Sequence, residues 1–155
     1  MRLGRRLGID AGTVRVGLAI SDPHGILASP LSNLKRLADD QQTAEALASI
    51  VSEYELLEIY VGLPLSLRAT NTASTMDAVN LAKAIEQKLS VPVRLIDERM
   101  TSVSANAILK NAGRGNKQAR KVVDQVAATL ILEQALNIEK TGVLPGIPLT
   151  DFEKD

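Results

Sequence analysis

Hydrophobic and polar residues alternate along the first part of the chain, which is the pattern of β-strands that bury one face. Residues 6–20 show this alternation twice, on either side of a tight turn at 11–13. A second turn at 22–25, with aspartate, proline, histidine and glycine, leads into a weaker strand at 26–34. The chain is therefore predicted to open with a meander of three antiparallel strands.

From about Asp40 the hydrophobic spacing changes to every third or fourth residue, which is typical of amphipathic helices. Helices are predicted from near Asp40, over 79–89, over a short stretch at 102–111 that stops at Gly113, and over 117–137. The apolar stripe of the last helix is expected to consist of Val122, Val123, Val126, Leu130 and Leu132.

Two short apolar segments, 59–63 and 91–96, lie between these helices and are predicted to be strands. Strands that alternate with helices need parallel neighbours with right-handed crossovers. We therefore expect an α/β fold with a five-stranded mixed sheet, formed by the antiparallel meander plus parallel strands. Residues 1–141 are expected to form a single domain, and the glycine- and proline-containing tail at 142–155 is expected to be irregular.

The length of 155 residues agrees with one domain. An apolar fraction of 45% and a charged fraction of 23% are those of an ordinary globular protein and disfavour disorder, collagen and coiled coils. No apolar run is long enough to span a membrane, and no secretory signal follows the basic start of the chain. The sequence therefore predicts a cytoplasmic protein that does not act at a membrane.

The rarest residue types restrict the possible chemistry. Cysteine is absent and His24 is the only histidine, which excludes disulfides, thiolate metal sites, cysteine nucleophiles and multi-histidine metal sites. Aromatic residues make up only 2% of the chain, so any nucleic-acid contact would be mainly to phosphate rather than by base stacking. Aspartate and glutamate remain plentiful, 18 in all against 18 lysines and arginines, and they favour carboxylate chemistry.

Some of these acids occupy positions that solubility does not explain. Asp10 ends the first strand, Asp97 and Glu98 end the last, and Asp124 lies inside the last helix. The carboxyl ends of parallel strands emerge at one edge of a sheet, so these acids are expected to converge there. A cluster of carboxylates needs protons or a cation, and an all-oxygen site favours Mg²⁺ or Mn²⁺.

A run of basic residues precedes Asp124, and no acid occurs between Glu98 and Asp124. Two hard cations next to phosphate-binding residues suit phosphoryl transfer to water. The candidates for contacts with nucleic acid are Arg15, Arg99, Arg114, Lys117, Arg120 and Lys121.

Each acid also has a simpler interpretation. Asp10 could be a turn residue that hydrogen-bonds its own backbone while Gly12 takes a positive φ. Glu98 could form a solvated ion pair with Arg99. Asp124 could pair with the lysine one helical turn earlier. The predicted convergence of the acids at one edge is what favours a metal site over these alternatives.

Four segments resemble the motifs of the YqgF/RuvX-type family, which comprises Holliday-junction-resolvase-like members of the RNase H superfamily. In chain order they are GIDAGTVRVGLAISD at 8–22, VGLP at 61–64, DERMTS at 97–102 and KVVDQVAA at 121–128. Four motifs in the right order are far more specific than any one of them. The resemblance spans residues 7–136.

The resemblance implies an RNase H-like fold with helices on both faces of the sheet. It implies a metal-dependent nuclease that processes the 5′ end of pre-16S rRNA, with a ribosomal precursor particle as the setting. A DNA nuclease of the Holliday junction resolvase type is the alternative substrate class.

The resemblance also implies which acids are catalytic and bind the metal, namely Asp10, Glu98 or its neighbour Asp97, and Asp124. Strand alternation lets only one of the two neighbours face the site, and Glu98 is favoured. Many RNase H-like nucleases carry an acid at the end of the fourth strand, where this chain has Gly62. Asp22 is left as a candidate for that ligand.

Two other functions fit part of the sequence. The segment 10–13 is similar to the phosphate-binding turn of sugar kinases and actin-like ATPases, although those proteins need two such domains to close on a nucleotide. A module that binds RNA or a protein without catalysis, on the same scaffold, is the other alternative.

Overall fold

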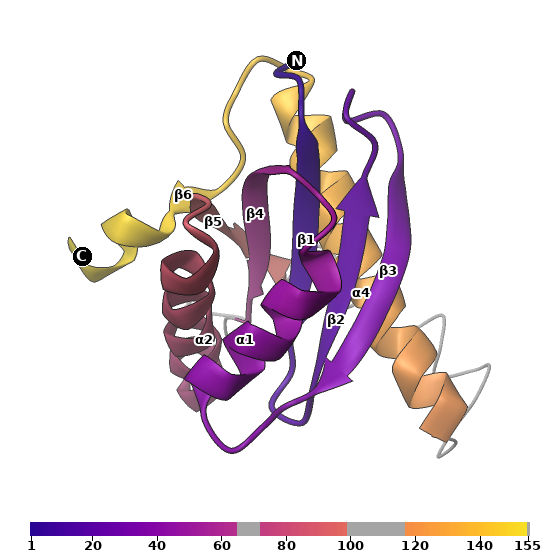
Figure 1. Cartoon of the computed structure of the whole chain (residues 1–155). Coiled ribbons are helices and arrows are strands. Elements are labelled where there is room, and N and C mark those ends of the chain that lie inside the picture. The colour runs from indigo at the N-terminus through magenta and orange to yellow at the C-terminus, as the bar shows by residue number, and fades with distance from the viewer. Residues whose placement is uncertain (65–71, 99–116, 155) are drawn as a thin grey trace.

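The computed structural model describes residues 1–64, 72–98 and 117–154, with the backbone alone for 117–125, 153 and 154. A six-stranded sheet forms its centre, in the order β3-β2-β1-β4-β5-β6 (Figure 1). The strands are β1 (Arg5–Ala11), β2 (Arg15–Ser21), β3 (Ala28–Lys35), β4 (Leu56–Leu63), β5 (Val93–Asp97) and β6 (Ile147–Pro148). The predicted helix at 102–111 lies outside the described residues.

The direction of the strands follows the prediction. β1, β2 and β3 form the antiparallel meander, and β1, β4 and β5 run parallel to one another. β1 therefore lies between an antiparallel and a parallel neighbour. As a result, the carboxyl-terminal ends of β1, β4 and β5 share one edge of the sheet, which is also the edge where β1 turns into β2 and β3 ends.

Helices cover both faces of the sheet, as predicted. The helices are α1 (Asp40–Val51), α2 (Ala73–Leu89) and α4 (Lys117–Glu139). α1 and α2 lie on one face and α4 on the other (Figure 1). The side chain of Asp39 caps α1 by accepting a hydrogen bond from the Gln42 N–H at 2.8 Å. None of the described helices has the length and apolar character needed to span a membrane.

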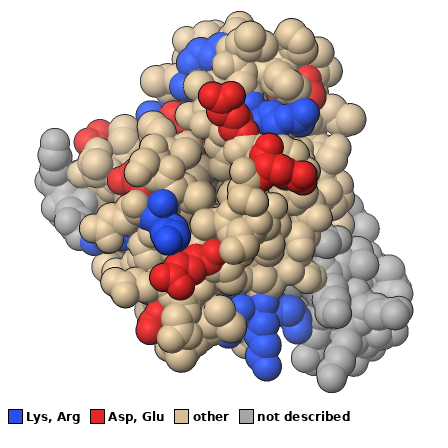
Figure 2. Space-filling view, in the orientation of Figure 1, with Lys and Arg blue, Asp and Glu red and all other residues tan. Residues whose placement is uncertain are grey.

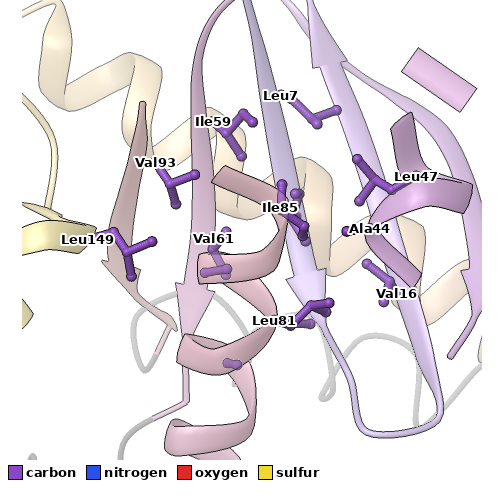
Figure 3. Close-up of a cluster of buried hydrophobic side chains, with 14 of the residues drawn as sticks. Leu7, Val16, Ala44, Leu47, Ile59, Val61, Leu81, Ile85, Val93 and Leu149 are labelled. Atoms are coloured by element: carbon purple, nitrogen blue, oxygen red, sulfur yellow. The ribbon is translucent and has the colours of Figure 1, made fainter. Parts of the chain in front are cut away.

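Alternation along the strands divides their side chains between two hydrophobic layers. Leu7 and Ile9 of β1 and Val61 of β4 are fully buried in the layer beneath α1 and α2. Leu47 of α1 and Ile85 of α2 pack into the same layer (Figure 3). A slip of one residue would move this set of side chains to the other face of the sheet. The packing of this layer therefore also determines which side chains face α4.

The layer beneath α4 is closely packed because a glycine lies under the helix. A Cβ on Gly8 of β1 would lie 2.7 Å from Cβ of Leu132 and 2.8 Å from the carbonyl oxygen of Ala128. The predicted apolar stripe is therefore wrong in part. Val126 and Leu130 are only half-buried, and the first two valines of that stripe lie outside the described side chains. The buried residues of α4 include Ala127, Ala128, Ile131, Leu132, Ala135 and Leu136. Small alanines of α4 face the sheet because the helix closely approaches the backbone of β1 at Gly8.

The prediction of an irregular tail over 142–155 is wrong for its second half. Ile147–Pro148 form β6, which is antiparallel to β5 and makes the sheet six-stranded rather than five-stranded. A 3₁₀ helix (Leu149–Lys154) follows, and Leu149 is buried in the core at 3% exposure. Arg94 fixes the segment that leads into β6, because its Nε donates a hydrogen bond to the carbonyl oxygen of Pro145 at 2.6 Å. A two-residue strand has no periodicity, so local sequence gives no signal for it.

Candidate active site

The shared edge of β1, β4 and β5 brings together acids that are far apart in the sequence. The register pairs Ile9 with Val61 and Gly62 with Ile96. Asp10 therefore lies beside Gly62, and Glu98 follows directly after the end of β5. The predicted convergence of these strand ends is confirmed.

Asp10 and Glu98 lie on the side of the sheet that α4 covers. Asp10 alternates with Gly8, which contacts α4. Oε2 of Glu98 lies 2.7 Å from the point where a Cβ on Gly62 would be placed, and Cδ1 of Ile131 in α4 lies 2.5 Å from the same point. The Glu98 carboxylate thus extends over β4 toward β1.

Asp97 belongs to the other side of the sheet. Val93 and Leu95, which precede it at alternate positions of β5, lie in the hydrophobic layer beneath α1 and α2. Of the two neighbouring acids, Glu98 is therefore the one that shares the α4 side with Asp10. The role of either acid as a metal ligand stays a prediction.

Glu98 lies in an environment that disfavours its ionised form. Burial raises the pKa of its carboxyl above the ordinary value, and the negative charge of Asp97 raises it further. A cation placed beside such a carboxylate would stabilise its charged form. The electrostatics therefore fit a site that is completed by a positive ion.

Gly62 leaves open the space next to the Glu98 carboxylate, which the sequence analysis did not predict. It was considered only as the place where related nucleases carry an acid, whereas here the missing side chain gives the Glu98 carboxylate its space. A glycine inside a strand is a known sign of close approach by another group. That signal was present in the sequence, but it did not identify the group.

The turn after Asp10 differs from the simpler interpretation offered above. Gly12 does not have a positive φ, so that part of the alternative is wrong. Glycine is needed because a Cβ at this position would lie 2.5 Å from the carbonyl oxygen of Arg15. The Gly12 N–H donates to the carbonyl oxygen of Asp10 at 3.1 Å, which tightens the chain at the end of β1.

Arg36 also went unnoticed in the sequence, although it contacts this turn directly. Its Nη1 donates to the carbonyl oxygen of Gly12 at 2.9 Å, and its backbone N–H donates to that of Val14 at 2.8 Å. The same guanidinium binds Asp77 of α2 and Asp40 of α1. Nothing in the local sequence distinguishes Arg36 from its basic neighbours, because its partners come from three other segments.

Asp22 is wrong as a candidate metal ligand. It follows β2 and therefore lies at the opposite edge of the sheet from Asp10. Its carboxylate accepts hydrogen bonds from the N–H groups of Leu27 and Ile26 at 2.8 Å each and of His24 at 3.1 Å. These bonds lower the pKa of Asp22, that from Leu27 most of all. Asp22 shapes the turn between β2 and β3, and His24 is a residue of that turn, as predicted.

Cationic side chains gather at the edge that carries the acids. Arg15, a predicted nucleic-acid contact, begins β2 directly opposite Lys35, the last residue of β3. Lys35 is exposed. Figure 2 shows lysine and arginine side chains grouped at the lower edge of the molecule, where Figure 1 shows β3 ending. Lys35 was missed in the sequence because only the β2–β3 register brings it opposite Arg15.

The remaining predicted site residues lie outside the described side chains. They are Arg99 and Arg114, together with Lys117, Arg120, Lys121 and Asp124 of α4. Within the side chains that are described, no three or more acids or histidines come together in a way that could hold a metal ion. Position 124 precedes Ala128 by one helical turn, and Ala128 contacts Gly8 of β1.

A sequence model of the family RuvX, described as Holliday junction resolvase, matches residues 4–138 of this chain. The match covers the whole segment that contains the edge with Asp10 and Glu98.

Curated relatives carry one name, "Putative pre-16S rRNA nuclease". A relative from Leifsonia xyli subsp. xyli is 48% identical over 150 residues, which cover 96% of each chain. A relative from Clavibacter michiganensis subsp. michiganensis is 42% identical over 145 residues, or 94% of this chain and 90% of that one. A relative from Mycobacterium leprae is 45% identical over 135 residues, or 86% and 73%.

Solved structures of RuvC from Thermus thermophilus share the fold. The chain in complex with a Holliday junction substrate has a TM-score of 0.59 at 15% identity, covering 94% of this chain and 99% of that one. A second RuvC structure has a TM-score of 0.53 at 14% identity, with 93% and 99% covered. The expected RNase H-like fold is confirmed by this likeness.

Proposed function

Because the chain belongs to the RuvX family, we propose that it is a nuclease that hydrolyses phosphodiester bonds in structured nucleic acid with the help of divalent metal ions. The observation that carries the proposal is the Glu98 carboxylate, which lies over Gly62 on the same side of the sheet as Asp10. Carboxylates at the carboxyl ends of parallel strands are at the edge where α/β sheets bind ligands.

We propose precursor 16S rRNA as the substrate, cleaved near its 5′ end on a ribosomal precursor particle in the cytoplasm. The shared name of relatives at 41–48% identity over most of the chain supports this substrate. The alternative is a DNA junction, which the description of the matching family supports. The two substrates are separated by the experiment below.

Mg²⁺ or Mn²⁺ fits the donors at this edge. Asp10 and Glu98 offer only carboxylate oxygens, and the raised pKa of Glu98 marks a carboxyl that gains from a nearby cation. Asp124, one turn before the residue of α4 that contacts β1, is the third proposed ligand. Asp97 is the weaker candidate because it belongs to the other side of the sheet. Bound metal would activate a water and stabilise the leaving oxygen.

The acidic and the cationic residues of the chain would then have separate roles. Asp10 and Glu98 would hold negative charge at the reacting centre, with Gly62 leaving room for the second carboxylate. Arg15 and Lys35 would bind backbone phosphates on the β2–β3 side of the site. Arg99, Arg114, Lys117, Arg120 and Lys121 remain the proposed phosphate contacts on the other side.

The test compares wild type with Asp10→Asn, Glu98→Gln and Asp97→Asn on two substrates, a precursor rRNA fragment with its 5′ leader and a four-way DNA junction. We expect Mg²⁺-dependent cleavage of the RNA by wild type and by Asp97→Asn, and loss of cleavage in the other two variants. Asp97→Asn decides between the two neighbouring acids, since it removes the adjacent charge from the opposite side of the sheet. Equal cleavage by wild type and Asp10→Asn would contradict the mechanism, and cleavage of the junction alone would reassign the substrate.

A further inference from the structure

Arg36 connects the end of β1 to two helices. Its side chain is 12% exposed. Nη1 donates to the Gly12 carbonyl oxygen at 2.9 Å and to Oδ2 of Asp77 at 2.8 Å. Nη2 donates to Oδ1 of Asp77 at 3.1 Å and to Oδ1 of Asp40 at 2.9 Å. One guanidinium therefore joins the β1–β2 turn, the N-terminal turn of α1 and the start of α2.

The guanidinium is held firmly in its place. The hydrogen bonds that Arg36 donates to Asp77 raise the pKa of Arg36 most strongly, against the effect of burial, and Asp40 raises it further. The two-pronged contact with Asp77 also restricts the orientation of the planar group. The donor that reaches the Gly12 carbonyl is thus aimed before any ligand arrives.

On one side, these contacts act on Asp10. The Gly12 carbonyl that Arg36 binds belongs to the same residue whose N–H donates to the carbonyl of Asp10. The backbone N–H of Arg36 holds the far end of the turn at Val14. The turn that directly follows β1 is consequently attached to Arg36 at two points.

On the other side, the contacts lead to the end of β4. Asp77 belongs to α2, and Thr75 of the same helix donates through its hydroxyl to the carbonyl oxygen of Pro64. Pro64 directly follows β4, two residues after Gly62, over which the Glu98 carboxylate lies. A continuous series of contacts therefore joins the strand end that carries Asp10 to the strand end that seats Glu98.

We propose that Arg36 is a positioning residue that fixes the end of β1, and with it Asp10, relative to Gly62 of β4, where the Glu98 carboxylate lies. The proposal rests on the proposed function, because it assigns the spacing of two acids that are expected to bind metal together. A merely structural Arg36 would contribute through its ion pairs alone. Since Asp77 and Asp40 are each about one-third exposed, those pairs are partly solvated.

The test separates the ion pair from the contact with the turn. Arg36→Lys keeps a cation for Asp77 but cannot bind Gly12, Asp77 and Asp40 together with a planar fork. The charge exchange R36D/D77R restores an ion pair between the two positions but leaves no donor for the Gly12 carbonyl. Arg2→Gln is the matched control, because Arg2 also joins two acids, Glu58 and Glu139, at the opposite edge of the sheet.

Three quantities are measured on the full chain: the affinity for Mn²⁺ by calorimetry, kcat and KM on the RNA fragment, and Tm. We expect Arg36→Lys and R36D/D77R to bind Mn²⁺ about 10- to 100-fold more weakly, as removal of a residue that orients a metal ligand does. kcat should fall with it while KM stays within about twofold, since the proposed phosphate contacts are intact. R36D/D77R should recover much of the Tm lost in Arg36→Asp alone.

Arg2→Gln should lower Tm and leave the affinity for Mn²⁺ unchanged. The proposal is overturned if R36D/D77R recovers Mn²⁺ affinity together with Tm, or if Arg36→Lys binds Mn²⁺ like wild type. Should Arg36→Asp fail to fold, Arg36→Lys alone decides. Asp10→Asn separates the proposed function from the proposed role of Arg36. If Asp10→Asn binds Mn²⁺ as wild type does, the proposed function fails. If Asp10→Asn loses affinity while Arg36→Lys binds Mn²⁺ like wild type, only the role of Arg36 is rejected.

Discussion

Acidic side chains lie at both ends of the interface between α4 and the sheet, in different electrostatic surroundings. At one end, Glu139 accepts hydrogen bonds from Arg2 at 2.7 Å and from Arg6 at 3.0 Å, and Arg6 is completely buried. Arg2 also binds Glu58 at 2.7 Å. At the other end lies Glu98, beside a second acid.

The pKa values of Glu139 and Glu98 are shifted in opposite directions. Desolvation would raise the pKa of Glu139, but the hydrogen bonds and positive charges of Arg2 and Arg6 outweigh it and lower that pKa. Burial and the charge of Asp97 both raise the pKa of Glu98. A buried acid with arginine partners is complete in the folded chain, whereas an acid with a raised pKa fits a site that gains from an added cation. The comparison therefore separates a structural cluster from a candidate catalytic one.

Tyr60 adds a buried hydroxyl donor to the structural cluster. Its hydroxyl donates to Glu58 at 2.9 Å, and its side chain is fully buried. Burial, together with the charge of Glu58, raises the pKa of Tyr60, so it stays a neutral donor. Through Glu139, these contacts connect the C-terminal part of α4 to Arg2 and Arg6 at the N-terminal end of the chain.

The largest expected difference between the two ends is in catalysis. Glu98→Gln should lower the rate of RNA cleavage by more than about 100-fold, because changes to residues that only support a metal ligand already cost about 10- to 100-fold. Glu139→Gln, assayed well below its Tm, should cleave like wild type. A kcat measurement on both variants checks this. Loss of cleavage in a folded Glu139→Gln would remove the distinction between the two ends.

The next largest effect is on the free energy of unfolding, and here Glu139→Gln is expected to change more than Glu98→Gln. Glu139→Gln should lower the free energy of unfolding by roughly 3–5 kcal/mol, because it leaves the buried Arg6 without its charged partner. Glu98→Gln should be neutral or stabilising in the absence of metal, because burial and the charge of Asp97 disfavour the ionised carboxylate that it removes. Urea denaturation of both variants in a chelator gives the two values. A destabilised Glu98→Gln would mean that this end is structural as well.

A matched pair of glycines sharpens the comparison further. Gly8→Ala and Gly62→Ala both place a Cβ within 2.8 Å of an atom across the interface and should each cost about 1–3 kcal/mol of stability. Only Gly62→Ala collides with the Glu98 carboxylate. It should therefore weaken Mn²⁺ binding by more than its effect on stability predicts, as titrations of both variants would reveal. Equal Mn²⁺ affinities would argue against Gly62 as the seat of Glu98.

The smallest effect is the pH dependence of the arginine-paired end. The pKa of Glu139 is lower in the folded chain than its ordinary value of 4.5, so its pairing stabilises the fold above that pH and is lost as the pH falls through the lowered pKa. The difference in unfolding free energy between wild type and Glu139→Gln should shrink below about pH 4.5. Urea titrations at pH 7, 5 and 3.5 measure it. A difference that stays constant with pH would show that the ionised carboxylate is not what stabilises this end.

Parts of the site could be predicted because they follow from local pattern. Alternation and turn residues indicated the meander, and the strand–helix order required parallel neighbours, so the convergence of Asp10 and Glu98 followed from topology. Alternation predicted that only one of Asp97 and Glu98 would face the site but did not decide which, and the structure puts Glu98 on the side of Asp10. The roles of these acids in binding metal await the experiments above.

Other parts could not be predicted because they depend on which segments meet. Arg36 has partners in the β1–β2 turn, α1 and α2, and Lys35 is placed by the register of two strands. β6 exists only because the tail returns to β5. Asp22 looked similar to the other acids in sequence, but it lies at the opposite edge and binds its own turn.

The sequence alone determined the order of β1 to β5 and of the helices between and after them that the structure describes. It also determined the absence of cysteine and near absence of histidine, and therefore a chemistry based on carboxylates. These properties follow from composition and from short-range periodicity, which act over a few neighbouring residues. The tertiary structure placed Glu139 beside Arg2 and Arg6, and it placed the Glu98 carboxylate over Gly62 beside another acid. Charge interactions depend on distance and burial in three dimensions, so two glutamates that look alike along the chain acquire opposite shifts of pKa.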